Sequence, residues 1–250
     1  MPADPRKRLE LLWGSSTPKR PGPRPKLTVD QIVATAIGIA DAEGIEAVSM
    51  QRVATELGYT TMSLYRYVPS KEQLVEVMLD RAGEAPPPPG DDEQSWRSEL
   101  ENWVDGVWAM YLRHPWVLQV PITGAPSGPN QLAWFDAGLR PLVRAGLRDG
   151  DLMATILFLL GAVQQLAQLS VSMSTARTEA GVTMAETQAG YNAILQEFVS
   201  AERFPTLAKL TSAGVFAPTG LPDEGLDIDL KFGVQRVLDG IESYVQTGTS

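Results

Sequence analysis

The sequence predicts an all-α protein with an N-terminal three-helix domain of the helix-turn-helix type and a larger helical C-terminal domain. Apolar residues recur three and four positions apart along most of the 250-residue chain, as in amphipathic helices. No segment alternates apolar and polar residues between hairpin turns, so no β-sheet is expected. A proline run within residues 85–90 cannot be helical and indicates a boundary between domains at 28–84 and 91–250.

Two helices are predicted at the start of the N-terminal domain. The first follows Thr28, a residue type that caps helix N-termini, and ends at Gly44. The second follows Ser49 and stops at Gly58. Both have apolar positions at helical spacing, which are Val29, Ile32, Val33, Ala36, Ile37, Ala40, Val53, Ala54 and Leu57.

A third helix completes the three-helix unit, and a fourth follows it before the proline run. A very short one is predicted over residues 62–67, because Pro69 blocks its continuation. The next follows Ser70, which has the spacing of a capping box with Gln73.

Basic residues are concentrated before the first predicted helix. Residues 1–27 carry a net charge of +5, whereas residues 28–81 carry −4 and the whole chain −9. Repeated prolines between residues 17 and 26 favour an extended conformation over a helix. We therefore expect residues 1–27 to form a flexible basic arm that either follows DNA or remains a solvated tail. The basic residues nearest the first helix are Lys19, Arg20, Arg24 and Lys26.

Helical patterns also fill the C-terminal domain. The predicted helices cover about 95–113, 130–146, 151–176, 183–199, 203–213 and 228–247. A two-fold dimer needs an apolar face left over after the core has packed, and the 151–176 and 228–247 helices are the best candidates for it. The alternative is that both apolar stripes face the core of one monomer.

Residues 49–67 have the pattern of a helix-turn-helix motif. A helix that enters the major groove of DNA must be short, firmly held and faced with small or polar side chains. Leu64 and Val68 can anchor the short helix inward. The side chains that can then point outward are Thr61, Ser63, Tyr65, Arg66 and Tyr67. Spacing alone also allows two packed core helices with no role in DNA binding.

The details of this segment are more specific than its spacing. The segment has an N-cap serine at Ser49, a Val-Ala pair at Val53, a Leu-Gly pair at Leu57 and a Leu-Tyr pair at Leu64. Lys71 then starts the fourth helix. This arrangement resembles the DNA-binding domain of TetR-family transcriptional regulators over about residues 28–80. A weaker resemblance to the ligand-binding domain of the tetracycline-repressor branch covers residues 95–96 and 231–242. The resemblance implies a homodimer in which the 151–176 and 228–247 helices form an intersubunit four-helix bundle.

The resemblance also implies roles for individual residues. The start of the short helix would face base edges or phosphates, and its tyrosines would contact phosphates, sugars or thymine methyl groups. Arg66 could reach a base, for which guanine is the commonest partner, while Lys71 would contact a phosphate. Gln51 lies where the family often makes a further DNA contact. With the arm, the candidate DNA-binding residues are Lys19, Arg20, Arg24, Lys26, Gln51, Thr60, Thr61, Met62, Ser63, Tyr65, Arg66, Tyr67 and Lys71.

Aromatic residues cluster early in the C-terminal domain, with five tryptophans between residues 96 and 134. Aromatic-lined cavities suit flat hydrophobic ligands, although core packing explains each residue singly. Glutamines within the apolar segment 151–172 could orient a ligand, or could instead be solvated or pair across a dimer interface. The candidate effector-binding residues are Trp103, Trp108, Trp116, Trp134, Phe158, Gln164 and Gln168.

The chain is poor in groups that perform catalysis. It has no cysteine and one histidine, His114, and no serine or carboxylate lies in a recognisable catalytic motif. We therefore expect no enzyme, no metal and no cofactor. The N-terminus lacks the apolar segment of a secretory signal, and the longest apolar run, residues 152–163, is too short to span a bilayer. A cytoplasmic protein that does not bind membranes is expected.

Together these observations predict a DNA-binding transcriptional regulator. The first hypothesis is a repressor that binds a palindromic operator in double-stranded DNA as a homodimer and is released by a small hydrophobic or aromatic effector. The alternative is a DNA-binding regulator without a small-molecule effector, controlled by a protein partner.

Overall fold

The computed structural model describes residues 5–14, 27–90, 95–121, 124–218 and 226–248. Within these ranges the regular structure is helical and contains no strand, as the apolar periodicity predicts. The chain forms two compact units, residues 1–165 with 233–250, and residues 166–232. The proline connector at residues 85–90 therefore lies inside the first unit, where the contacts described below join the helices on either side of it.

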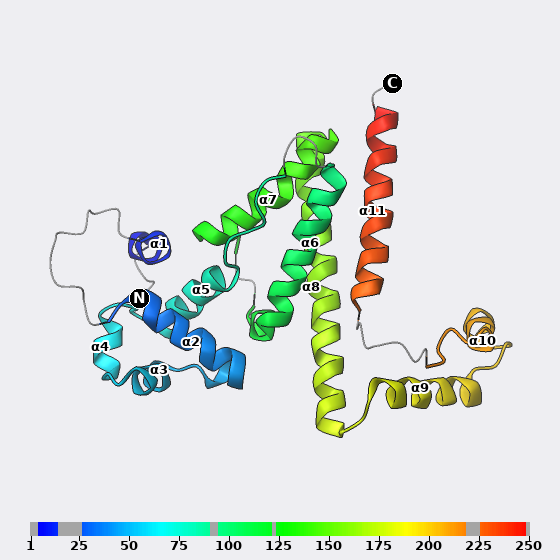
Figure 1. Ribbon diagram of the computed structural model, residues 1–250, viewed down its shortest axis with the longest axis horizontal. Coiled ribbons are helices and arrows are strands. Elements are labelled where there is room, and N and C mark those ends of the chain that lie inside the picture. Colours follow the sequence, from blue (N-terminus) through cyan, green and yellow to red (C-terminus); the bar gives the residue numbers. More distant parts are fainter. Residues whose placement is uncertain (1–4, 15–26, 91–94, 122–123, 219–225, 249–250) are drawn as a thin grey trace. The chain divides into compact units, whose positions relative to one another are not determined.

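The N-terminal helices follow the predicted order (Figure 1). They are α2 (Val29–Glu43), α3 (Met50–Leu57), α4 (Thr61–Tyr65) and α5 (Lys71–Ala82). Thr28 and Gln31 form a full capping box at the start of α2. At α5 only half of the predicted box is formed, because Ser70 accepts a hydrogen bond from the backbone N–H of Gln73 while Gln73 itself is buried in the domain.

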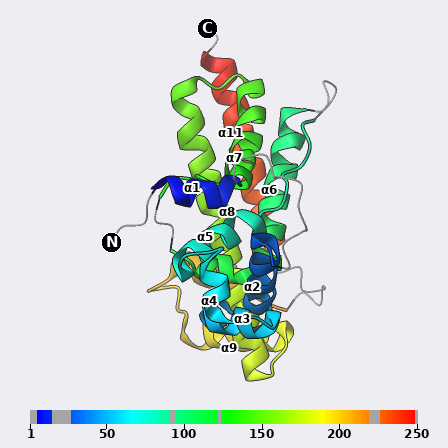
Figure 2. The same cartoon turned by 90° about the vertical axis from the view of Figure 1, so that its left-hand side faces the viewer.

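A further helix, α1 (Pro5–Trp13), precedes this domain and was not predicted. Proline is well tolerated in the first turn of a helix, and the prolines that block helix formation begin only at Pro18. Leu12 is buried in the core of the N-terminal helices, and α1 packs against α5 (Figure 2). The predicted arm therefore begins with a docked helix. The rest of it, residues 15–26, lies outside the described residues.

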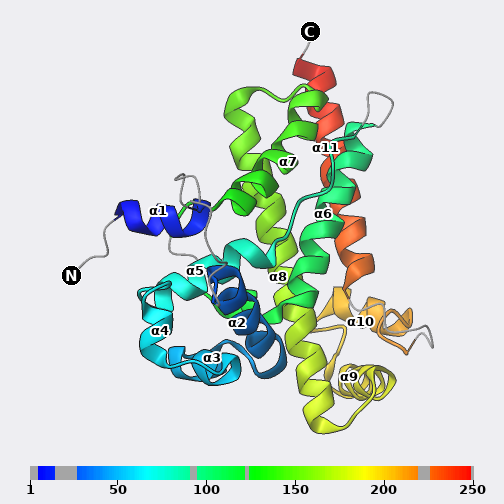
Figure 3. The same ribbon diagram turned by 60° about the vertical axis from the view of Figure 1, so that its left-hand side comes forward.

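The C-terminal part of the first unit is a group of packed helices (Figure 3). Helices α6 (Trp96–Arg113) and α7 (Pro129–Ala145) pack along each other. The first half of α8 (Asp149–Ala180) and α11 (Asp227–Gly248) from Gly233 onward belong to the same unit. The 3-10 turn η2 (Pro115–Gln119) follows α6 and packs against α2 and a second turn, η1 (Ile45–Ala47).

The second unit contains the end of α8, α9 (Met184–Phe198), α10 (Pro205–Ser212) and the residues up to Phe232. Helix α9 starts with a capping box between Thr183 and Glu186, and it packs against α10. Tyr191 and Phe216 meet edge to face with their ring centroids 5.9 Å apart.

Candidate DNA-binding surface and effector site

The short helix α4 is anchored from beneath and exposed above. Leu64 and Val68 are fully buried in the core of the N-terminal helices, as predicted. Met62 is 73% exposed, Tyr65 is 43% exposed, and Arg66 is exposed as well. A short helix that is held rigidly while its other side chains protrude has the form required to enter a major groove.

The turn before α4 depends on a glycine. Gly58 has φ 72° and ψ 29°, a left-handed conformation that favours glycine, and its N–H bonds to carbonyls of the last turn of α3. Helix α3 therefore ends at Leu57, and α4 begins three residues after Gly58, at Thr61. Local sequence thus determines how α4 is presented.

The other predicted DNA-binding residues of this region differ in exposure. Gln51 and Thr60 are exposed, and the Thr60 hydroxyl lies 2.9 Å from that of Ser63. Tyr67 packs partly against the core, so less of its ring is available to DNA than an outward position would give. The half-buried members are Thr61, Ser63, Tyr67 and Lys71.

Charge on this surface is mixed. Arg52 on α3 forms ion pairs with Glu43 at 2.9 Å and with Glu56 at 3.8 Å, so its charge is locally balanced. Within the part of the chain that the structure describes, neither Arg66 nor Lys71 forms an ion pair. These two cations are therefore available to phosphates or bases.

Lys71 nevertheless stands beside an acidic neighbour. Hydrogen bonds with the Ser70 side chain and with its own backbone N–H lower the pKa of Glu72 below the ordinary value of glutamate. Glu72 is therefore ionised at neutral pH, and a phosphate that approaches the start of α5 meets both signs of charge. The arm residues Lys19, Arg20, Arg24 and Lys26 lie outside the described residues, so their contribution stays a prediction.

In the C-terminal domain, two tryptophans pack against glycines. Trp134 on α7 donates its indole N–H to the carbonyl of Gly83 at 2.6 Å, and a methyl group at Gly106 on α6 would lie 2.7 Å from its ring. Trp103 on α6 donates to the carbonyl of Trp134 at 2.8 Å, and a methyl group at Gly138 on α7 would lie 2.6 Å from its indole. The absence of a Cβ at these glycines makes room for the two indoles between α6 and α7.

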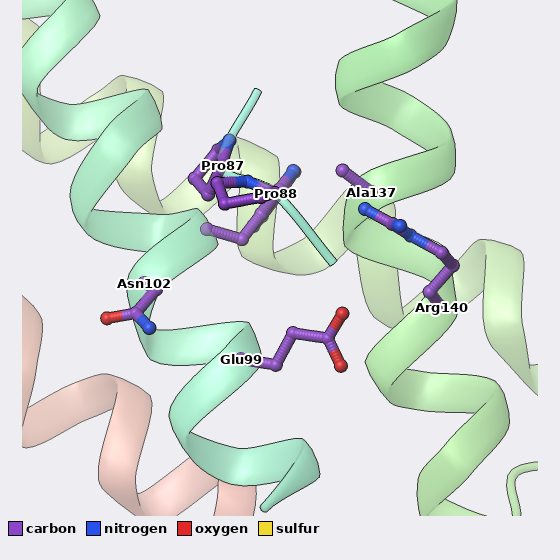
Figure 4. Close-up of a pocket in the computed structure, with 7 residues that line it drawn as sticks. Pro87, Pro88, Glu99, Asn102, Ala137 and Arg140 are labelled. Carbon is purple, nitrogen blue, oxygen red and sulfur yellow. The ribbon is translucent and has the colours of Figure 1, made fainter. Parts of the chain in front are cut away.

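A small cavity lies beside Trp103, between α6, α7 and the proline connector (Figure 4). Its volume is about 20 Å³, enough for a water molecule but not for an aromatic ligand. The Arg140 Nε atom is buried and has no hydrogen-bond partner in the described chain, while Glu99 pairs with Arg144 at 2.8 Å. The residues that line the cavity are Pro87, Pro88, Glu99, Asn102, Trp103, Ala137 and Arg140.

Other predicted effector residues lie elsewhere. Trp116 is buried in the core of the N-terminal helices, because η2 turns it toward α2, and its indole N–H donates to Asp41 at 2.8 Å. Trp116 therefore lies apart from Trp103 and Trp134, although it follows α6 closely in the sequence. Phe158 is 64% exposed on α8. Trp108 is buried, yet it does not line the cavity.

The predicted glutamines are divided between the two compact units. Gln164 is half-buried in the first unit. Gln168 belongs to the second unit, where its Nε2 donates to Ser172 Oγ at 3.3 Å. Of the seven candidates, only Trp103 lines the cavity, and Trp134 is held beside Trp103 by the hydrogen bond from the Trp103 indole.

Phe158 instead belongs to an open groove between α8 and α11. The groove has a volume of about 450 Å³. Neighbouring apolar residues on α8, Met153 and Leu157, are 47% and 56% exposed. The lining residues are Leu147, Asp151, Ala154, Thr155, Phe158, Val237, Gly240, Ile241 and Tyr244. An exposed apolar face of this kind is uncommon on a monomeric soluble protein.

Sequence analysis missed the residues that join the two predicted domains. These are Asp41, Asp80 and Gly128. Gly106 and Gly138, which make room for the indoles of Trp134 and Trp103 between α6 and α7, were missed as well. The glycines inside the predicted helices, Gly106 and Gly138, carried a usable signal, because glycine in a helix interior often marks a close approach. The two aspartates had none, since their partners lie 50 or more residues away in the sequence.

Comparison with known proteins identifies the class to which this architecture belongs. Residues 32–78 match the model of bacterial regulatory proteins of the tetR family, and residues 88–245 match that of the tetracyclin repressor-like C-terminal domain. The chain is 39% identical over 239 residues to the HTH-type transcriptional repressor DrrR1 of Streptomyces coeruleorubidus, across 95% of this chain and 85% of that protein. Both domains of a helix-turn-helix transcriptional regulator are therefore present, and the protein is not an enzyme.

Two further relatives support the same assignment. The chain is 28% identical over 145 residues to the class C tetracycline repressor protein of Escherichia coli, across 55% of this chain and 65% of that protein. ActR of Streptomyces coelicolor, solved in complex with actinorhodin, matches with a TM-score of 0.70 and 26% identity over 88% of this chain and 99% of ActR. The chain belongs to the TetR family of bacterial transcriptional regulators.

Proposed function

We propose that the protein is a homodimeric repressor that binds a palindromic operator and is released from it by a small, hydrophobic, aromatic effector in the cytoplasm. The observation that carries the DNA-binding part is the anchored helix α4, with Leu64 fully buried and Met62, Tyr65 and Arg66 exposed. The repressor part is supported by the similarity to DrrR1, which is itself a transcriptional repressor.

Base recognition is assigned to α4 and phosphate binding to its surroundings. Arg66 is exposed and unpaired within the described chain, so a bidentate contact to a guanine is open to it. Lys71 and the backbone N–H groups at the start of α5 would hold a phosphate. Because the described part of this surface carries both signs of charge, the arm residues Lys19, Arg20, Arg24 and Lys26 would supply further phosphate contacts.

Dimerisation is assigned to the groove between α8 and α11. The groove is apolar, and Phe158 at its wall is 64% exposed, which is costly for an isolated subunit in water. A second copy of α8 and α11 would cover this face in an isologous interface. The dimer would present two α4 helices to half-sites about 34–36 Å apart, or a multiple of this distance.

Helix α8 is also long and apolar enough, by length and composition, to cross a membrane. Acidic residues in its first turn, Asp149 and Asp151, and the internal glutamines are more consistent with an interface between subunits. In a dimer, the partner subunit would bury the exposed apolar side chains of α8. Membrane insertion is not part of the proposed function.

The effector site is assigned to the space between α6 and α7 that Trp103 and Trp134 now fill. Both indoles offer flat apolar surfaces. Polar groups nearby are the Arg140 guanidinium, whose Nε lies 3.8 Å from Asp136 Oδ2, and the Glu99 carboxylate, which pairs with Arg144. Support for a small-molecule effector comes from ActR, which has been solved with actinorhodin bound. An aromatic effector would replace an indole in this space, because the cavity of about 20 Å³ cannot hold it otherwise.

The same small cavity favours the second candidate, a DNA-binding regulator that has no small-molecule effector and is controlled by a protein partner. In that case Trp103 would be a permanent core residue. The two candidates differ in what Trp103→Ala does: in the first it changes which aromatic compounds the protein binds, and in the second it only lowers stability.

The first experiment measures the affinity of the protein for its own upstream DNA at several salt concentrations, with a scrambled duplex as control. We expect operator binding tighter than that to scrambled DNA by about 10³ or more. If both duplexes bind equally, selection of sites from the whole genome follows. A selection that enriches no sequence would contradict the proposed function.

The dimer is tested with Phe158→Glu, which places a charge in the α8–α11 groove. Leu112→Glu is the matched control, because Leu112 is an exposed apolar residue on α6, 44% exposed, outside the groove. Sedimentation analysis should give a monomer for Phe158→Glu and a dimer for the control. A dimeric Phe158→Glu variant would place the interface elsewhere.

A further inference from the structure

The last turn of α5 makes an unusual contact with the start of α7. Asp80 on α5 is fully buried, and its Oδ1 accepts hydrogen bonds from the backbone N–H groups of Asn130 and Gln131, both at 3.0 Å. The Asn130 side chain donates in return to the backbone carbonyl of Asp80 at 3.1 Å. A carboxylate from one helix therefore caps the N-terminus of another, 50 residues away in the sequence.

Gly128 makes this contact possible. It is the N-cap of α7 with φ −81° and ψ 155°, a conformation that any residue can adopt. A methyl group at this position, however, would overlap the Asp80 carboxylate. Glycine is therefore required here by the space that Asp80 occupies and not by the backbone conformation.

The contact is poorly optimised for stability alone. Asp80 Oδ2 is buried and has no hydrogen-bond partner among the described residues. Burial raises the pKa of Asp80 above the ordinary value of aspartate, against the opposing effect of the Gln131 and Asn130 N–H groups. A serine or asparagine of α7 itself would cap this helix without burying a charge. The costly arrangement therefore suggests a role beyond capping.

Two more hydrogen bonds converge on the same place. The Trp134 indole binds the carbonyl of Gly83, directly after α5, at 2.6 Å. The Trp13 indole at the end of α1 binds the carbonyl of Ser127, next to Gly128, at 3.0 Å. Helix α5 is thus held to α7 directly and through the docked helix α1, while the other end of α5 carries Lys71 and faces the proposed DNA contact.

We propose that Asp80 is a positioning residue for DNA recognition, whose carboxylate, seated at Gly128 on α7, fixes α5 and with it the DNA-reading helices relative to the C-terminal domain. This inference rests on the proposed function. A dimer binds a palindrome only when both α4 helices are correctly placed. Loosening the Asp80 contact should therefore weaken specific binding, because a smaller fraction of molecules is competent, and leave non-specific phosphate contacts unchanged.

The experiment compares the full-length wild type with Asp80→Asn, Gly128→Ala and the control Asp30→Asn. Asp30 is an exposed carboxylate on α2 whose nearest cation, Arg81, is at 3.4 Å. Each variant is first tested by thermal unfolding, so that binding is measured where it is folded. Affinities for the duplex selected by the wild type and for its scrambled form are then determined, together with amide hydrogen exchange of residues 128–138.

We expect Asp80→Asn and Gly128→Ala to exchange at least about tenfold faster near Asn130 and Gln131, the effect of losing a charge-assisted hydrogen bond. The ratio of specific to non-specific affinity should fall about tenfold, with the affinity for scrambled DNA and its salt dependence unchanged. Asp30→Asn should match the wild type. Asp80→Ala removes the carboxylate that a Gly128 methyl group would overlap but keeps the Cβ atom 2.9 Å from it, so Gly128→Ala should cost less in the Asp80→Ala background than in the wild type.

Three results would overturn the inference. Unchanged exchange in Asp80→Asn would show that the carboxylate does not hold α7. Faster exchange with an unchanged affinity ratio would reduce Asp80 to a local cap. A wild type that does not distinguish any selected duplex from scrambled DNA would refute the proposed function and this role with it, whereas the first two results refute the role of Asp80 alone.

Discussion

Asp41 is the acceptor that ties η2 to α2, and its removal gives a prediction with a calculable size. Its Oδ1 accepts from Trp116 Nε1 at 2.8 Å and lies 2.7 Å from His114 Nδ1. Trp116 is 1% exposed and His114 8% exposed, so neither donor can turn to water when the carboxylate is gone. Each unsatisfied buried donor costs about 1–3 kcal/mol. We therefore expect Asp41→Ala to lower the free energy of unfolding by about 2–4 kcal/mol.

The assay is urea unfolding followed by circular dichroism, with Asp30→Ala as control. Asp30 lies on the same helix, and its side chain is 82% exposed, so its loss should cost less than about 0.5 kcal/mol. Trp116→Phe removes the donor instead of the acceptor and leaves Asp41, whose side chain is 32% exposed, open to water. The double variant should therefore be less destabilised than the sum of the single ones, by about 1–2 kcal/mol.

Two outcomes would refute this reasoning. Equal midpoints for Asp41→Ala and Asp30→Ala would mean that the hydrogen bonds to Trp116 and His114 contribute nothing net. Strict additivity in the double variant would mean that Asp41 and Trp116 do not act through each other. Either result would remove η2 as a tie between α6 and the N-terminal helices.

Four other substitutions test three further parts of the structure. Lys71→Ala should weaken binding to all duplexes alike and reduce the slope of the salt dependence by about 1. Arg66→Ala should weaken the free energy of operator binding by about 1–3 kcal/mol and relax specificity at one base pair. Titrations at two or more salt concentrations measure both effects. Gly138→Ala places a methyl group 2.6 Å from Trp103 and 2.7 Å from Ile156, so its unfolding midpoint in urea should fall by the equivalent of about 1–3 kcal/mol; an unchanged midpoint would mean that the indole moves freely. The hydrogen bond from Arg97 lowers the pKa of Asp239, so the stabilisation by ionised Asp239 is present above the ordinary aspartate pKa and is lost as pH falls through the lowered value. The difference in stability between wild type and Asp239→Asn should therefore shrink below about pH 4. A constant difference would argue against the ion pair.

The N-terminal helices were predictable because their signals are local. Thr28, Ser49 and Ser70 cap α2, α3 and α5 as their sequence positions indicate, and Gly58 ends α3 in the left-handed conformation. Each of these decisions involves residues within four positions of one another. Leu64 was predicted to anchor α4 from the pattern of the short helix, and it is fully buried.

The contacts between the predicted domains could not be found in this way. Asp80 and Asp41 lie in amphipathic helices, where carboxylates are usually exposed, and only the folded chain brings the α7 N-terminus and the Trp116 indole to them. Helix α1 was missed for a related reason, since its pattern is short and Leu12 is buried only because other helices provide a core. The composition of residues 1–27 predicted a flexible arm, whereas α1 forms in its first half; the proline-rich residues 15–26 lie outside the described residues.

The position of Trp134 links these contacts to the proposed effector response. Its indole fills the space between α6 and α7 and at the same time donates to the carbonyl of Gly83, which directly follows α5. A ligand that takes the place of this indole therefore breaks a hydrogen bond to α5, while one that displaces only Trp103 leaves that bond in place. Because coupling is reciprocal, DNA that holds α5 in one position must oppose the first ligand and be nearly indifferent to the second. The compounds that release DNA should thus be those that compete with Trp134, and binding alone does not distinguish them from the rest.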